Sequence, residues 1–481
     1  MKNLIDPVIK RWKESNGYRE ILIIAIPLII STGSWSLQTF IDRMFLSWYS
    51  TESIAAAMPA GMLSFTLLSF FLGTAGYVST FVAQYKGAGH PEKIGPVLWQ
   101  GIYLAMIGGL AIFLLIPIVP SLFKLANHDP AVQKLEVTYF TILCYGAFPA
   151  ILANVLSGFK SGLGNTWPVM WVNLIATLFN IIFTYPLVFG KFGFPELGIA
   201  GAAIVTSLCP VVSVILYVFL IFNKKNNEKY KVISGFRFDK KLFLRLIRFG
   251  LPSGAHFFLD ICAFTLFSLF IGSLGKEMLA ASNIAFSINS ITFMPMIGLG
   301  IAVSILVGQN QGRETPSASI RCVWSGFHLT FSYMTLLAIF LFLIPDFFIA
   351  PFMVSTDPSS IEAIKATCRI LLKFVAIYTL FDSANMLFAS ALKGAGDTKY
   401  VMISNLLLSF LVFVLPSYLS IFYFHKTIYE AWAVATTYIS LLGLNFLLRF
   451  IKGKWKSMRV IEEHCIEDFD DDKPAPEQIG H

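Results

Sequence analysis

Charged residues are scarce in this chain. Only 13% of its 481 residues are Asp, Glu, Lys or Arg, whereas about a quarter of a typical soluble domain is charged. Hydrophobic residues make up 56% of the sequence, and the mean hydropathy is +0.70. This balance excludes an ordinary soluble protein and predicts an all-α polytopic membrane protein.

The sequence also lacks the common motifs of thiol, metal and hydrolytic chemistry. Its six cysteines show no paired spacing, and five of them fall in or beside apolar runs, so we interpret them as small packing residues. The patterns HExxH, GxSxG and the phosphate-binding P-loop are absent. We therefore expect no enzymatic activity, no cofactor and no resident metal. Residues 1–20 lack a cleavable signal, and the first apolar run is expected to act as the insertion signal.

The few basic residues are concentrated in the N-terminal segment, in residues 223–248 and in residues 451–459. A net charge of +8 distributed in this way fits the positive-inside rule, and we expect no nucleic-acid partner. The pattern predicts a multi-pass protein of the plasma (inner) membrane with both termini in the cytoplasm. Residues 462–481 are acidic and poor in aromatics, which is typical of a disordered tail.

Apolar runs long enough to cross a bilayer occur twelve times. The predicted spans are residues 21–47, 54–83, 96–119, 136–158, 167–188, 197–222, 244–273, 279–309, 321–345, 361–391, 400–424 and 428–451. We accordingly expect an N-terminal segment 1–20, an N-terminal lobe 21–222, a basic linker 223–243, a C-terminal lobe 244–451 and a tail 452–481.

The two halves of the chain resemble each other. "GLGNTWPVMWVNL", which begins at residue 162, matches "GAGDTKYVMISNL", which begins at residue 394, at seven of thirteen positions. A second match has a constant offset of 225 and aligns Gly73, Val78, Ser79, Val82, Gln84, Gly87 and Pro91 with Gly298, Val303, Ser304, Val307, Gln309, Gly312 and Pro316. Six spans in each half predict a parallel repeat and two pseudo-symmetric six-helix bundles, which is typical of transporters.

Three carboxylates, Asp42, Asp260 and Asp382, lie deep in predicted spans. Each is a candidate functional residue, because a carboxylate at mid-bilayer costs roughly 2.5–3.5 kcal/mol on insertion scales. None has an acidic counterpart at the repeat-related position, so the two lobes are expected to differ in chemistry. Polar side chains at helical spacing accompany them: Gln38 before Asp42, His256 before Asp260, and Tyr378 and Asn385 on either side of Asp382.

Such polar stripes fit more than one role. They could coordinate a dehydrated cation, carry a proton, or only hydrogen-bond across helices. In the N-terminal half, Asn173 and Asn180 lie seven residues apart and therefore on one helix face. They could join the Asp42 site or bind neighbouring helices.

Four segments together resemble the multidrug and toxic compound extrusion (MATE) family and, within it, the NorM-like branch. They are "FIDRMFLSWYSTESIAAA", "YPLVFGKFGFPELGIAGAAIVTS", "GLPSG" with an acid eight residues after its proline, and "LFDSANMLFASALKGAGDT". The resemblance extends from about residue 20 to 450. It implies two six-helix bundles around a V-shaped cavity, and export of bulky, often cationic amphiphiles in exchange for Na⁺ or H⁺.

By the same resemblance, Asp42, Asn180, Tyr378 and Asp382 match residues of the family's coupling sites. Two positions depart from the pattern: Asp260 stands where the branch usually has glutamate, and Thr184 stands where a carboxamide or aspartate is usual. Both departures concern the coupling ion.

Two other functions remain as alternatives. A flippase for a lipid-linked precursor belongs to the same superfamily, but it is expected to need basic residues around its cavity, whereas the deep ionisable groups here are mostly acids. An intramembrane enzyme is disfavoured by the missing motifs. We expect an antiporter, acting as a monomer, whose partners are small amphiphilic substrates and membrane lipids.

Overall fold

The computed structural model describes residues 10–124, 129–353 and 361–462, and this part of the chain is helical without strands. The N-terminal helices are α2 (Tyr18–Tyr49), α3 (Thr51–Ala75), α4 (Val78–Gly87), α5 (Ile94–Phe113), α7 (Pro130–Tyr145), α8 (Ala147–Gly162), α9 (Trp167–Phe189) and α10 (Ile199–Ile221). The C-terminal helices are α12 (Lys240–Gly272), α13 (Lys276–Gly312), α14 (Pro316–Leu343), α16 (Ile361–Ala395), α17 (Thr398–Leu408), α18 (Leu415–Tyr418) and α19 (Ile428–Lys452). Short connecting elements are η1 (Pro91–Lys93), η2 (Ile116–Ile118), α6 (Val119–Lys124), α11 (Lys224–Tyr230), α15 (Pro345–Ile349), η3 (Ala350–Phe352) and η6 (Lys454–Ser457), and the π-helical turns η4 (Ser409–Val414) and η5 (Leu419–Tyr423) flank α18.

All twelve predicted spans fall on these helices. In the described part of the chain, ten helical segments are long and apolar enough to cross a membrane. The pair α7 and α8, bent by 43°, forms an eleventh. The remaining span is α16, a 35-residue helix whose first half carries Glu362, Lys365, Arg369 and Lys373. It packs against α13, α14 and α19.

Helix ends follow local sequence rules. Asp239 caps α12 by accepting hydrogen bonds from the backbone amides of Lys241 and Leu242, which satisfies donors that have no partner in the first turn. Gly190 ends α9 at a φ of +64°, a backbone conformation that glycine adopts without strain.

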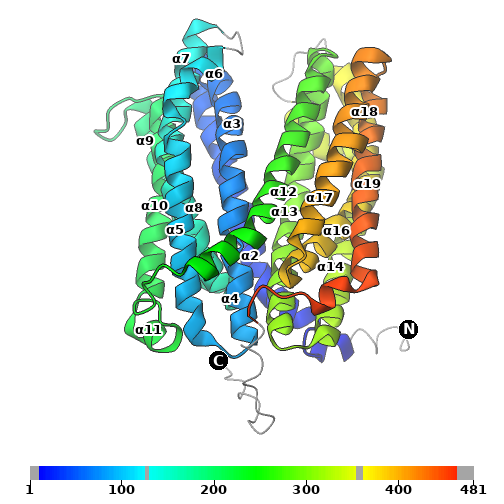
Figure 1. The fold of residues 1–481 in the computed structure, drawn as a ribbon. Coiled ribbons are helices and arrows are strands. Elements are labelled where there is room, and N and C mark those ends of the chain that lie inside the picture. The colour runs from blue at the N-terminus through cyan, green and yellow to red at the C-terminus, as the bar shows by residue number, and fades with distance from the viewer. Residues whose placement is uncertain (1–9, 125–128, 354–360, 463–481) are drawn as a thin grey trace.

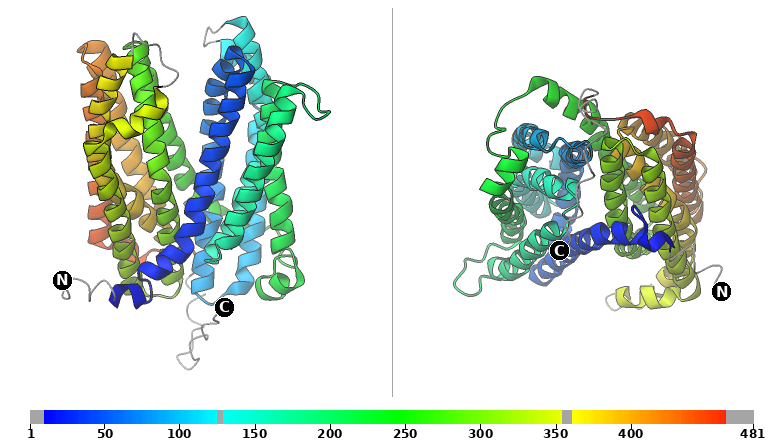
Figure 2. Two further views of the ribbon diagram at one scale, coloured as in Figure 1. Left: turned by 180° about the vertical axis from the view of Figure 1, so that it is seen from behind. Right: turned by 90° about the horizontal axis from the view of Figure 1, so that it is seen from below.

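The helices form two lobes (Figures 1 and 2). The lobes meet at the end of the molecule where α2 begins and α19 ends, called the closed end below, and diverge toward the opposite, open end. Each lobe has its own hydrophobic core. The V shape that the family resemblance implies is therefore present.

The first helix of each lobe begins beside the other lobe. Ile21, Ala25 and Leu28 of α2 belong to the core of the C-terminal lobe, while Leu242 and Leu246 of α12 belong to the core of the N-terminal lobe. Both helices then rise into their own lobes, as Figure 1 shows for α12. The closed end is consequently built from crossed, repeat-related helices.

Candidate functional site

Asp42 lies on α2 within the N-terminal lobe and is 7% exposed. Its carboxylate accepts hydrogen bonds from three side chains on two neighbouring helices: Asn180 Nδ2 at 3.4 Å, Thr184 Oγ1 at 3.3 Å and Thr206 Oγ1 at 3.1 Å. No ion pair between Asp42 and Arg43 is found in the described residues, so the carboxylate is held by neutral donors.

Of the three side chains expected around Asp42, Asn180 donates a hydrogen bond to it. Asn180 is fully buried, and its Oδ1 atom has no hydrogen-bond partner, which leaves an amide oxygen available beside the carboxylate. Asn173 instead donates to Ser31 on α2. Gln38 is half-buried on α2.

Asp382 lies on α16 in the C-terminal lobe and is 6% exposed. Asn385 Nδ2, one turn later, donates to its Oδ1 atom at 2.9 Å, as the helical spacing predicts. Tyr378, one turn earlier, is buried and lies within electrostatic reach of the carboxylate. The polar stripe read from the sequence is therefore a local cluster on α16.

Asp260 on α12 is placed next to side chains from two further helices. The Tyr438 hydroxyl of α19 lies 3.4 Å from Asp260 Oδ1 and donates to Asn405 Oδ1 of α17 at 2.8 Å. Asn405 in turn donates to the backbone carbonyl of His256 at 3.4 Å. His256 thus contributes its backbone to this network, and its side chain is buried.

Asp260 and Asp382 belong to one electrostatic cluster. The charge of Asp260 acts on Asp382, and Tyr438 lies within reach of both carboxylates. Lys393, at the end of α16, also acts on Asp260. The ion pairs of the described residues all join other side chains. Within this part of the chain, no Lys, Arg or His nitrogen lies within 4.0 Å of Asp42, Asp260 or Asp382.

Sequence reasoning missed Thr206, Asn405, Tyr438 and Lys393. Asn405 could have been found, because the repeat aligns it with Asn173. The local sequence around the other three does not indicate which neighbouring helix they face.

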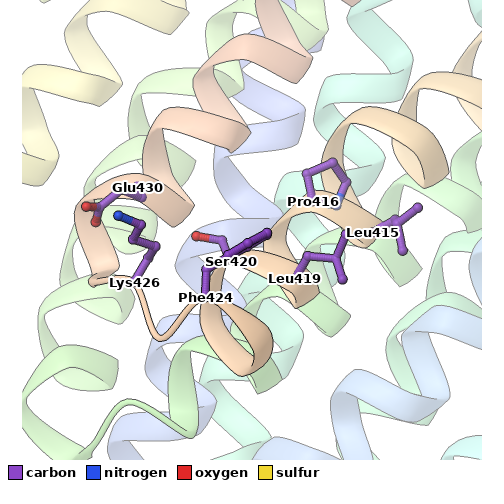
Figure 3. Close-up of a pocket in the computed structure, with 7 residues that line it drawn as sticks. All are labelled: Leu415, Pro416, Leu419, Ser420, Phe424, Lys426 and Glu430. Atoms are coloured by element: carbon purple, nitrogen blue, oxygen red, sulfur yellow. The ribbon is translucent and has the colours of Figure 1, made fainter.

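A surface pocket lies away from these acids. It is lined by Leu415, Pro416, Leu419, Ser420, Phe424, Lys426 and Glu430, around α18, η5 and the start of α19 (Figure 3). The carboxylate of Glu430 accepts a hydrogen bond from the Thr427 backbone amide, which caps α19. The pocket is thus a local feature of a helix terminus, and it contains none of the three intramembrane acids.

The fold and the buried carboxylates define the class: a polytopic membrane transporter built from two six-helix lobes. The MatE family model matches residues 27–186 and again residues 252–419, and the chain belongs to this family. The two matches begin 225 residues apart, at the offset of the internal repeat.

Individual relatives of the chain are described as multidrug resistance proteins or transporters. The chain is 28% identical over 382 residues to a probable multidrug resistance protein NorM of Shewanella oneidensis, covering 79% of this chain and 82% of that protein. A protein of the same description from Thermotoga maritima is 23% identical, with 94% and 96% covered. An outward-facing multidrug resistance MATE family transporter has the same fold, with a TM-score of 0.83, 19% identity, and 93% and 98% of the two chains covered.

Proposed function

We propose that this protein is a secondary active antiporter that exports bulky, cationic amphiphilic compounds in exchange for Na⁺ or H⁺. The observation that carries the proposal is the cluster of Asp382, which is buried, and Asp260, which is half-buried, with no cationic side-chain nitrogen within 4.0 Å of either carboxylate in the described residues. A buried charge of this kind is stable only when a counter-ion or a proton neutralises it. The cluster is therefore suited to bind and release the coupling ion.

We further propose that the closed end faces the cytoplasm. The basic residues of α11 and of the segment after α19 lie at this end, which agrees with the positive-inside rule. The open end then faces outward, as in the outward-facing relative. Asp42, with the free amide oxygen of Asn180, forms a second ion site in the N-terminal lobe, and the chain works as a monomer.

The test is dye efflux from proteoliposomes, with ethidium as substrate and a Na⁺ or an H⁺ gradient imposed separately. Asp382→Asn keeps the shape of the side chain and removes its charge, so it should abolish gradient-driven efflux while insertion stays normal. Asp346→Asn is the matched control, because Asp346 is exposed and pairs with Arg369 outside the cluster. It should retain efflux.

The outcomes separate the alternatives. Efflux driven by only one gradient identifies the coupling ion. Normal gradient-driven efflux by Asp382→Asn would refute the role of the cluster. Transport of an anionic lipid headgroup without ethidium efflux would favour the flippase.

A further inference from the structure

The closed end contains two hydrogen bonds that are related by the internal repeat. Gln84 Nε2 of α4 donates to the carbonyl oxygen of Gly394 in the other lobe at 3.0 Å. Gln309 Nε2 of α13 donates to the carbonyl oxygen of Gly162, again in the other lobe, at 3.0 Å. Both glutamines are buried. Since the repeat aligns Gln84 with Gln309 and Gly162 with Gly394, the bonds are reciprocal: each lobe supplies one donor and one acceptor.

The two acceptor glycines occupy equivalent positions in their lobes. A Cβ atom on Gly162 would lie 2.4 Å from the carbonyl oxygen of Ser79, and one on Gly394 would lie 2.4 Å from that of Ser304. Ser79 and Ser304 are themselves a repeat pair. Each acceptor carbonyl is therefore held at the same place by close packing within its own lobe.

A second pair of glycines allows the lobes to touch. A Cβ atom on Gly87 would lie 2.0 Å from the carbonyl oxygen of Gln309, and one on Gly312 would lie 2.1 Å from that of Gln84. Both obstacles are backbone atoms of the opposite lobe, which cannot move aside as a flexible side chain can. Neither glycine has a positive φ, so an alanine suits the helix and conflicts only with contact between the lobes.

We propose that these four residues, Gln84, Gln309, Gly87 and Gly312, form a reciprocal latch that holds the closed end shut and must separate when a transport cycle opens that end. This role rests on the proposed function, because only a transporter with alternating access needs the closed end to open. Outside such a cycle, the same contacts would merely fasten two lobes together.

The latch has a direct connection to the acidic cluster. Asp382 and Gly394 lie on the same continuous helix, α16. The carbonyl of Lys393, next to the acceptor of Gln84, also receives a hydrogen bond from Tyr77 of the other lobe at 2.6 Å. A shift of α16 on ion binding at Asp382 would therefore act on the latch. The acceptor helix of the N-terminal lobe, α8, carries no such acid.

The chain also contains a remote reporter of lobe separation. After α19, residues 453–462 run back across the closed end toward α4 (Figure 1). The backbone amide of Val460 donates to Gln84 Oε1 at 2.9 Å. Gln309 takes no part in that bond, so faster exchange of the Val460 amide in Gln309→Ala reports a change at the closed end beyond the lost bond itself. Gln311 of α13 holds the same segment by donating to the carbonyl oxygens of Trp455 and Met458, so exchange at the end of α13 is read alongside it.

The experiment is hydrogen exchange of the full chain in lipid nanodiscs, read by mass spectrometry without substrate. The first variants are Gln309→Ala and Gly87→Ala. The matched controls are Gln100→Ala, whose buried amide bonds Pro96 and Arg237 away from the latch, and Gly272→Ala, whose Cβ would meet only a Leu279 side-chain atom at 3.8 Å.

In Gln309→Ala, which loses one hydrogen bond, exchange should rise about 2- to 10-fold in the peptides around the ends of α4 and α13 and around Val460. The alanine at Gly87 should raise it by at least about tenfold, since the closed contact becomes sterically impossible. In both test variants, peptides from the two lobe cores should exchange at wild-type rates. In both control variants, the peptides around the ends of α4 and α13 and around Val460 should exchange at wild-type rates.

Unchanged exchange at Val460 in both variants would overturn the latch. An increase spread over the lobe cores in both variants would overturn it as well, because the residues would then serve folding. The exchange measurement needs neither ion nor substrate, so it is independent of the efflux assay. If the wild-type protein fails to export ethidium, the proposed function is refuted. The exchange result still decides whether these residues hold the two lobes together.

Discussion

Removing Asp260 and Asp382 together should weaken cation binding little more than removing either one. Each carboxylate that contacts the ion contributes a charge-assisted interaction of about 1.5–3 kcal/mol, so Asp260→Asn or Asp382→Asn alone should cost about 10- to 150-fold in cation affinity. Because the charges of the two carboxylates act on each other and both act on Tyr438, the loss of one carboxylate should already disable the common site. The coupling energy of this pair should therefore be about 1.5–3 kcal/mol, at the upper end of values for interacting residues.

Asp42 should behave differently. It is bonded to α9 and α10 in the other lobe, whose core is separate from that around Asp382. The cycle between Asp42→Asn and Asp382→Asn should then be additive within about 0.5 kcal/mol.

The assay is quenching of intrinsic tryptophan fluorescence during titration, first with Na⁺ at fixed pH and then with protons in a Na⁺-free buffer. Single and double variants are compared for each ion. A coupling between Asp42 and Asp382 as large as that between Asp260 and Asp382 would refute the reasoning, because it would require one continuous site across both lobes.

Two further predictions concern the N-terminal lobe and the segment after α19. Asn180→Ala should reduce the ion response that remains in an Asp382→Asn background, because it removes a donor to Asp42, whereas Asn173→Ala should leave that response unchanged; equal losses in the fluorescence titration would contradict this assignment. Burial raises the pKa of Glu462, but a hydrogen bond from Tyr85 and nearby positive charges outweigh burial, and the pKa lies below its ordinary value of 4.5. A lowered acid pKa stabilises the folded contact above the ordinary value, and this stabilisation is lost as the pH falls through the lowered pKa. The contact of residues 458–462 with the closed end should thus be equally stable from about pH 8 to about pH 5 and should weaken only in more acidic buffer. The measurement is amide exchange of this segment, corrected for its intrinsic pH dependence, and a loss of protection near neutral pH would disprove the prediction.

Several features were predictable from the sequence because their causes are local. Apolar runs of the right length predict the spans, since a bilayer leaves the backbone no other partner for its hydrogen bonds. The repeat predicts two similar lobes, and the family model matches both halves. Asn385 could be assigned to Asp382 because residues three apart on a helix are neighbours whatever surrounds them.

The contacts between helices were decided only by the tertiary structure. Thr206 reaches Asp42, and Tyr438 reaches Asp260, from helices that are distant in the sequence. Asn173 and Asn180 share a helix face, yet one contacts Ser31 and the other Asp42. A helix that is apolar on every side carries no stripe that indicates its rotation about its own axis.

At the closed end, too, the sequence determines some features and the tertiary structure decides others. The sequence by itself shows that Gln84 and Gln309 are equivalent, and that Gly162 and Gly394 are equivalent. It does not show that each glutamine bonds the glycine of the opposite lobe. That pairing depends on how α2 and α12 cross between the lobes, and in a membrane such crossings are determined by close packing and interhelical hydrogen bonds rather than by burial of apolar surface from water.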